Sequence, residues 1–118
     1  MLTNQEIFDA AWKQAQLKKK CVSVGTCLYR KYNEDGTCDK CFIGAAIPDE
    51  LYDRRLEQRS GAYVLAELGL IDSRQWLMDI RQSALVSELQ RVHDIVLVEY
   101  WNIELSAIAA KYSLTVPV

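Results

Sequence analysis

The chain has 118 residues, of which 50% are hydrophobic and 25% are charged, so we expect one globular domain over residues 1–118. Its formal net charge of -2 argues against direct nucleic-acid binding, which depends on many basic side chains. No run approaches the roughly 18 consecutive apolar residues that a membrane-spanning helix needs, so we expect no membrane partner.

The N-terminal segment predicts a helix and argues against a signal peptide. Because it has no basic start, we expect a cytoplasmic protein whose cysteines remain reduced. Thr3 and Glu6 have the spacing of a capping box, which satisfies free amides at the start of a helix. Apolar residues then recur with the helical period, and lysines follow at 18–20, where cations suit the last turn. Together these signals predict a helix over residues 4–19.

The cysteine-rich segment that follows predicts a β-hairpin. Residues 27–32 alternate between two faces, the pair Asp35-Gly36 is a strong turn signal, and residues 37–43 run back. With a loop of two or four residues, the expected cross-strand neighbours are Asn33 or Lys31 for Cys38, and Arg30 or Leu28 for Cys41. Cys27 and Cys38 are then about 10 Å or more apart along the strands, which is too far for a disulfide.

Two helix starts follow the hairpin. Pro48 suits the first position of a short helix, and Asp49 and Glu50 suit its first turn. Ser60 suits the N-cap of a second helix, which Gly69 can close in a left-handed conformation.

Helical periodicity continues to the end of the chain. Ser73 is a candidate cap for the segment RQWLMDI, and an apolar stripe predicts a helix up to about His93: Leu85, Val86, Leu89 and Val92. The run IVLVEYW at 95–101 suits either a strand or a joint between helices. A last helix is expected over 99–112, with the stripe Ile103, Leu105, Ile108, Ala109 and Tyr112. The three tryptophans, Trp12, Trp76 and Trp101, are expected in the core. The whole pattern predicts an α+β, predominantly helical fold, with four or five helices packed around a small β-hairpin.

The four cysteines allow more than one interpretation. A zinc module would use all of them as ligands: Cys21, Cys27, Cys38 and Cys41. However, Cys38 and Cys41 point to opposite faces of a regular strand, and no glycine directly follows Cys41 as it does in most zinc knuckles. A redox dithiol needs its C-x-x-C motif at a helix N-terminus. We therefore favour thiols that pack as small hydrophobes, with no cofactor and zinc as the alternative.

The single histidine raises the question of catalysis. His93 precedes Asp94 and could act as a base for a Cys27 or Cys41 nucleophile. No phosphate-binding, dinucleotide-binding, nucleophile-elbow or metalloprotease motif accompanies them. We interpret His93 as a structural residue that bonds the last carbonyls of a helix, and we expect no enzyme.

Three motifs occur in a fixed order: C-x-Y-R from Cys27, C-x-I-G-x-x-I-P-D-x-x-Y from Cys41, and L-Q-x-x-H-D from Leu89. This order resembles a group of small uncharacterised proteins of bacteria, bacteriophages and plasmids, over most of the chain. The resemblance includes Cys27 and Cys41 but not Cys21 or Cys38, which weakens the zinc interpretation. It marks these residues: Tyr29, Arg30, Gly44, Ile47, Pro48, Asp49, Tyr52, Gln90, His93 and Asp94.

Size, mild acidity and the resemblance together predict a non-catalytic protein of a mobile element that binds a host protein or protein complex. An inhibitor of a bacterial defence system, of the anti-CRISPR or anti-restriction type, is the first hypothesis. A small zinc-binding regulatory or nucleic-acid-binding module is the second. The candidate partner-binding residues are Tyr29, Arg30, Asp49, Glu50, Tyr52 and Asp53. The pattern leaves open whether the protein is a monomer or a homodimer.

Overall fold

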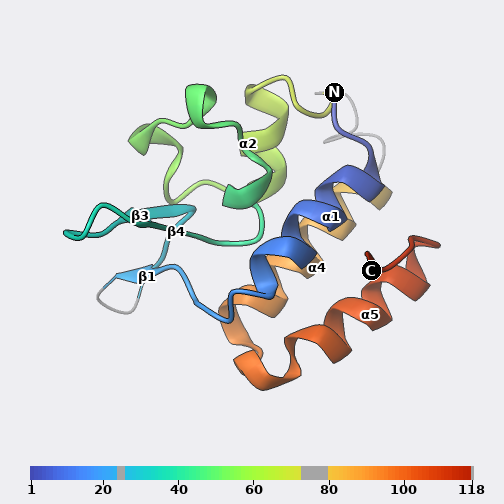
Figure 1. Ribbon diagram of the computed structural model, residues 1–118. Helices are drawn as coiled ribbons and strands as arrows, with labels where there is room; N and C mark the ends of the chain where they lie inside the picture. The colour runs from blue at the N-terminus through green and yellow to red at the C-terminus, as the bar shows by residue number, and fades with distance from the viewer. Residues whose placement is uncertain (24–25, 73–79, 118) are drawn as a thin grey trace.

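The computed structural model describes residues 1–23, 26–72 and 80–117 (Figure 1). Within them lie four α-helices: α1 (Asn4–Ala15), α2 (Gly61–Glu67), α4 (Ile80–Ile95) and α5 (Trp101–Lys111). Two antiparallel strand pairs join β1 (Val22–Ser23) to β2 (Thr26–Cys27), and β3 (Arg30–Tyr32) to β4 (Cys38–Lys40). Single 3-10 turns are η1 (Gly44–Ala46), η2 (Asp49–Leu51), η3 (Arg54–Leu56) and η4 (Val98–Tyr100). The fold is α+β and predominantly helical, as predicted.

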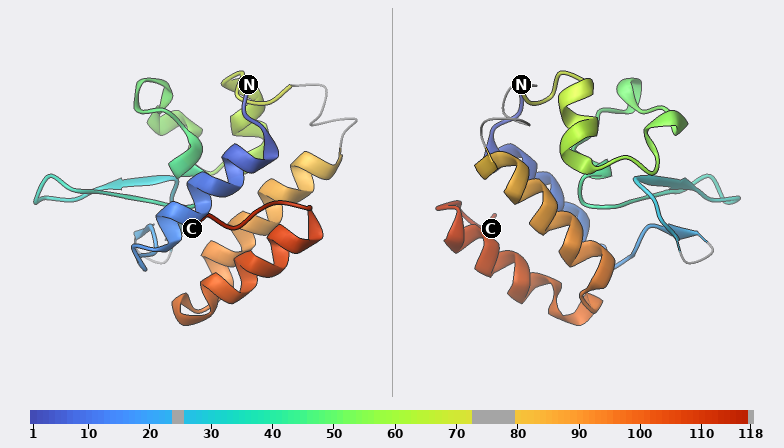
Figure 2. Two further views of the ribbon diagram at one scale, coloured as in Figure 1. Left: turned by 45° about the vertical axis from the view of Figure 1, so that its right-hand side comes forward. Right: turned by 180° about the vertical axis from the view of Figure 1, so that it is seen from behind.

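Helix α4 is at the centre of the helical packing, because it contacts α1, α2 and α5. The strand pairs lie on one side of the helices and α5 lies on the other, as the two views of Figure 2 show. The buried residues form one hydrophobic cluster, to which α1, α2, α4, α5 and the 41–56 segment all contribute. No helix in the described part of the chain is long and apolar enough to span a membrane.

Helix α1 begins as predicted and ends earlier than predicted. The capping box is present, since Thr3 Oγ1 accepts from the Glu6 amide and Glu6 Oε1 accepts from the Thr3 amide. The helix ends at Ala15 rather than at residue 19, and Lys18 has a left-handed backbone with φ of 57°. Residues 16–19 are exposed, so no buried contact holds another helical turn there, and the prediction that the lysines at 18–20 lie in the last turn is wrong.

The β3–β4 hairpin turns where predicted, but its register differs from the predicted one. Cys38 pairs with Tyr32, and the Cys41 amide bonds the carbonyl of Tyr29. The reason is loop length: Asn33 pairs with Thr37 around a loop of residues 34–36, and Gly36 has a φ of 87°. A loop of three residues with a left-handed glycine is a standard hairpin connection, and it shifts every partner by one residue.

Two further predictions about local structure are corrected. Residues 27–32 are not one strand, because the chain bends between β2 and β3 and each strand takes a different partner. The helix predicted from Pro48 is replaced by the two 3-10 turns η2 and η3. Helix α2 is confirmed, with Ser60 as its cap and Gly69 closing it at a φ of 74°. The predicted Ser73 cap and Trp76 lie outside the described residues.

The run 95–101 is a joint between helices. The Trp101 indole is fully buried and donates to the carbonyl oxygens of Val92 and Val96, both at 3.1 Å, so it caps the end of α4. The predicted apolar stripe of α4 is buried. In α5 the stripe is buried except at Ile103, whose exposed fraction is 67%. The prediction that Ile103 belongs to the core is therefore wrong.

Candidate functional site

His93 lies in the aromatic core, enclosed by Phe42 and Trp101 with ring centroids 5.3 and 5.8 Å from its own. Its Nε2 accepts from the Cys21 amide at 3.0 Å, and its Nδ1 lies 2.9 Å from Asp94 Oδ1. Because a backbone amide can only donate, the proton of the neutral ring is on Nδ1. Burial lowers the pKa of His93, and the neighbouring Asp94 carboxylate only partly opposes this.

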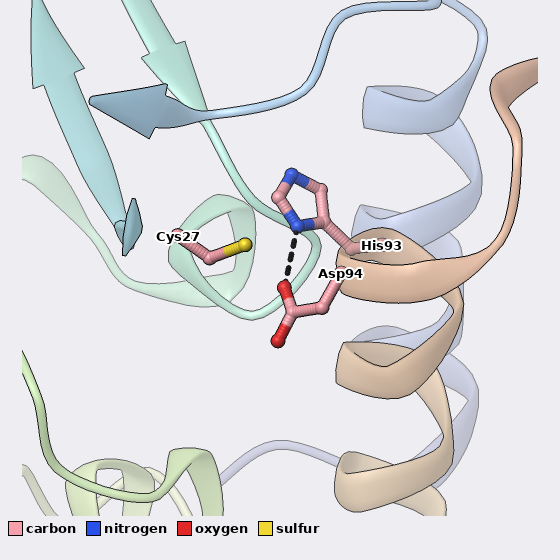
Figure 3. Close-up of side chains that lie close together, drawn as sticks. All are labelled: Cys27, His93 and Asp94. Carbon is pink, nitrogen blue, oxygen red and sulfur yellow. Dashed lines mark hydrogen bonds and ion pairs between the residues drawn. The ribbon is translucent and has the colours of Figure 1, made fainter. Parts of the chain in front are cut away.

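Cys27 completes a group that sequence reasoning did not assemble. The ligand-type atoms of Cys27, His93 and Asp94 all lie within 4.8 Å of one another (Figure 3). Among the described residues no other set of three such side chains is this close. The four cysteines of the alternative zinc interpretation do not form such a group.

The residues present do not fit a metal ion. A metal bound at Nδ1 of His93 would require the remaining ring proton on Nε2, because a neutral imidazole carries one proton. That proton would face the Cys21 amide, a second donor, at 3.0 Å. The backbone thus selects the tautomer that keeps Nδ1 protonated and directed at Asp94.

The same tautomer opposes a cysteine–histidine catalytic pair. Figure 3 shows that Cys27 lies on the side of the imidazole ring that carries Nδ1, whereas Nε2, which accepts from the Cys21 amide, points away from Cys27. A base must accept the thiol proton, and Nδ1 already carries one. Burial and a hydrogen bond to Asp94 also raise the pKa of Cys27, which disfavours the thiolate.

The remaining thiols are bonded within the protein. Cys21 is buried and lies 3.2 Å from the carbonyl of Asp39, and burial raises its pKa to about 12. Cys41 is buried, accepts from the Gly44 amide at 3.1 Å, and has its pKa raised by burial to about 12. Cys38 is half-buried, and all four cysteines are free thiols. This arrangement is typical of thiols that pack as small hydrophobes.

A second polar group joins the β3–β4 hairpin to the segment after it. Arg30 is almost fully buried, and its Nη1 donates to Asp49 Oδ1 at 2.7 Å while its Nη2 donates to the carbonyl of Ile47. Its guanidinium also stacks over the Tyr52 ring, with its carbon 5.0 Å from the centroid. The hydrogen bond from Arg30 lowers the pKa of Asp49.

Glu57 is the centre of this group, and sequence reasoning missed it. Its carboxylate accepts from the Tyr29 amide at 2.9 Å, from the Arg30 amide at 3.3 Å and from the Tyr52 hydroxyl at 2.7 Å. No signal in the sequence pointed to it, because the break in the strand before Arg30, which leaves two amides in need of an acceptor, is visible only in the structure. We call Arg30, Asp49, Tyr52 and Glu57 the hairpin network.

The predicted partner-binding residues therefore divide into two kinds. Tyr29 is buried and its hydroxyl bonds the carbonyl of Arg59, and three others belong to the hairpin network. Glu50 and Asp53 are exposed, and Asp53 caps η3 and pairs with Arg55 at 3.0 Å. The structure brings together Tyr29, Arg30, Asp49 and Tyr52, with Tyr29 joined through Glu57.

One exposed aromatic residue rests on the hairpin network. Tyr32 is 64% exposed, and its ring lies 6.1 Å from that of Tyr52 at an angle of 55°. Asp49 is exposed beside them and lies 3.7 Å from Lys40. We call Tyr32, Tyr52, Asp49 and Lys40 the tyrosine surface. It lies where the β3–β4 hairpin projects from the body of the molecule (Figure 1).

Comparison with known proteins finds no counterpart: no family model, no curated protein and no solved structure matches this chain.

Proposed function

We propose that this protein acts without catalysis, by docking on another protein through the tyrosine surface. The observation that supports the proposal is Tyr32, a large apolar side chain that is 64% exposed yet packed on a fixed support. Tyrosine is enriched among the residues that dominate binding energy, and such residues usually lie at the centre of an interface.

The support beneath Tyr32 is preorganised. The Tyr52 ring lies against the buried Arg30 guanidinium, and its hydroxyl donates to Glu57. Because these side chains are already held, a partner would not have to order them on binding, and this lowers the entropic cost of association. The exposed charges of Asp49 and Lys40 would form the polar rim of such an interface.

The class of partner is proposed from the sequence. The resemblance to small proteins of bacteriophages and plasmids favours a host protein complex, and an inhibitor of the anti-CRISPR or anti-restriction type is the form we propose. The bonding of His93 and the raised pKa of Cys27 support a role without catalysis.

Capture from host lysate with quantitative mass spectrometry tests the proposal. Wild-type protein, a Tyr32→Ala variant and an Ile103→Ala control would be immobilised at equal density. Ile103 is a suitable control because it is 67% exposed and belongs to α5, which lies on the other side of the helices from the strand pairs (Figure 2). We expect a specific host protein that Ile103→Ala retains and that Tyr32→Ala loses by about 30-fold or more, as for a binding hot spot.

Two results would contradict the proposal. If no host protein is enriched over an unrelated control protein, the binding role itself is wrong. If the enriched protein is retained equally by Tyr32→Ala, binding occurs elsewhere on the molecule. Circular dichroism of each variant establishes that it is folded before capture.

A further inference from the structure

A cavity of about 390 Å³ lies beside the tyrosine surface, where α1 ends. Its volume is within the range of roughly 300–1,000 Å³ that is usual for ligand pockets. Its walls come from α1 and the turn after it, from β4 and from η1: Ala10, Lys13, Gln14, Leu17, Lys40 and Ala45. We call these six residues the lysine cavity. Because Lys40 also belongs to the tyrosine surface, the two features are neighbours on the molecule.

The lining of the lysine cavity is apolar and basic. Its two alanines are half-buried, whereas Leu17 is 61% exposed in the turn after α1. Lys13 is exposed and Lys40 is half-buried, and the lining includes no carboxylate. Lys18, which is exposed as well, follows Leu17 directly. The cavity is therefore positively charged in a chain whose formal net charge is -2.

The acidic residues nearest to the cavity on α1 bond other groups. Asp9 lies four residues before Lys13, which is the spacing of a helix ion pair, but its carboxylate accepts from Gln5 Nε2 at 2.7 Å. Glu6 accepts from the Thr3 amide in the capping box. Among the residues that the structure describes, none forms an ion pair with Lys13. The Lys13 charge is therefore free to meet a group from another molecule.

Lys40 has one acidic neighbour, and the contact is loose. Asp49 Oδ1 lies 3.7 Å from the Lys40 amino group, whereas the same oxygen accepts from Arg30 at 2.7 Å. Asp39 precedes Lys40 in β4, and successive side chains of a strand point to opposite faces. The Lys40 ammonium can therefore donate to a second carboxylate while it stays near Asp49.

We propose that the lysine cavity receives an acidic segment of the partner protein, which places one apolar side chain against Leu17 and carboxylates beside Lys13 and Lys40. The charge of the cavity favours a segment of opposite sign, and its apolar walls favour a segment that also carries a large side chain. This inference rests on the proposed function, since Lys40 joins the cavity to the tyrosine surface. It adds the chemistry of the surface that the partner presents.

The acids around the cavity disfavour a longer polyanion. Glu6 and Asp9 precede the cavity on α1, and Asp49 lies beside Lys40. A nucleic-acid backbone or an anionic membrane surface would meet these carboxylates together with the lysines, and like charges brought together oppose binding. A phosphate chain also carries no apolar side chain for Leu17. A short protein segment with one or two carboxylates avoids both difficulties.

NMR titration of isotope-labelled protein with three end-capped peptides tests the proposal. EELFEE carries the proposed chemistry, KKLFKK reverses its charge, and EEGGEE removes its apolar side chains. We expect EELFEE to bind about 10-fold more tightly than either of the others, and to shift the amide signals of the lysine cavity. Equal affinity for EELFEE and KKLFKK, no binding of EELFEE, or shifts confined to other residues would overturn the proposal.

Two variants test the named residues. Lys13→Gln should weaken EELFEE binding by about 5-fold because it removes one charge, and Leu17→Ala should weaken it by about as much because it removes the apolar contact. Arg91→Gln is the matched control for Lys13→Gln, since Arg91 is exposed and lies in a groove between α4 and α5 that shares no residue with the lysine cavity. An equal loss in Lys13→Gln and Arg91→Gln, with native circular dichroism in both, would show that only net charge matters and would overturn the site.

Vesicles of phosphatidylserine and phosphatidylcholine test the competing occupant. We expect no cosedimentation of the wild-type protein with them. Cosedimentation that Lys13→Gln abolishes would assign the cavity to a membrane surface and overturn the choice of a protein segment.

The lysate capture separates this inference from the proposed function. If no host protein is enriched, the proposed function is wrong whatever the peptides show. If a host protein is captured through Tyr32 and Lys13→Gln retains it equally, only the inference about the lysine cavity is wrong. A host protein that both Tyr32→Ala and Lys13→Gln lose, while Arg91→Gln retains it, supports both.

Discussion

At the scale of the residue, His93 is a buried neutral imidazole whose two nitrogens are both bonded. Burial lowers its pKa below the ordinary value of 6.5, with Lys20 adding to this effect and Asp94 opposing it. Below that value the unfolded chain takes up a proton that the folded chain does not, so the free energy of unfolding decreases as the pH falls.

We therefore expect the free energy of unfolding to fall between pH 7 and pH 5, by at most about 1.4 kcal/mol per pH unit for one proton. Urea denaturation at several pH values measures it. A His93→Gln variant keeps an acceptor for the Cys21 amide and removes the titration, so its profile should be flat over the same range. An equal slope in both proteins would assign the pH dependence to other groups.

Glu57 provides a second prediction at the residue scale. Its replacement by alanine leaves the amides of Tyr29 and Arg30 without their acceptor, and an unsatisfied buried polar group costs about 1–3 kcal/mol. We expect Glu57→Ala to reduce the free energy of unfolding by about 2 kcal/mol or more on this basis. Glu50→Ala is the matched control, since Glu50 is exposed, and it should change stability by less than about 0.5 kcal/mol. Equal urea midpoints for the two variants would contradict the role given to Glu57.

At the scale of the element, the contact between η1 and the residue that precedes β3 depends on a glycine. A Cβ atom on Gly44 would lie 2.0 Å from the carbonyl oxygen of Tyr29, which is backbone and cannot move aside. The same carbonyl accepts from the Cys41 amide at 3.1 Å, so the clash would separate the hairpin from the turn after it.

Gly44→Ala should therefore lower the free energy of unfolding by about 3 kcal/mol or more, at the upper end for single substitutions. Gly69→Ala is the comparison: it meets no atom within 4 Å and has a φ of 74°, so it should cost only about 1 kcal/mol of backbone strain. Thermal unfolding followed by circular dichroism measures both. A smaller loss for Gly44→Ala than for Gly69→Ala would show that the two segments do not approach as closely as described.

The elements also show which local signals are reliable. Thr3 with Glu6, and Ser60 with Gly69, define helix ends by contacts within a few residues, and both were predicted. The hairpin register was not predicted correctly, because it depends on whether the loop at Asp35 has two, three or four residues. Each of these loops suits a turn with Asp35-Gly36, so the local sequence does not distinguish them.

At the scale of the whole molecule, one core includes residues from every α-helix that the structure describes. Trp101 lies inside it, in contact with the hairpin segment through Phe42 at 4.8 Å between ring centroids. We expect tryptophan fluorescence and far-ultraviolet circular dichroism to report one coincident urea transition, as for a single cooperative domain. Two separated transitions would instead show that the helices and the hairpin region unfold independently.

The candidate sites show the limit of prediction most clearly. Four of the six proposed binding residues are brought together, but they form a network that supports the fold, and Glu57 at its centre carried no signal of its own. The group of Cys27, His93 and Asp94 joins residues that are 66 positions apart in the sequence, 93 minus 27. Spacing along the chain gives no information about such contacts.

The sequence alone determined the fold class, the starts of α1 and α2, and the buried stripe of α4, because helical periodicity and capping depend on residues within one or two turns. Only the tertiary structure decided the hairpin register, the tautomer of His93 and the exposure of Ile103. Each of these depends on which distant group lies opposite: a strand partner, the amide of Cys21, or solvent where a core neighbour was expected. Local sequence patterns indicate which secondary structure a segment favours, whereas tertiary packing determines which groups its side chains contact.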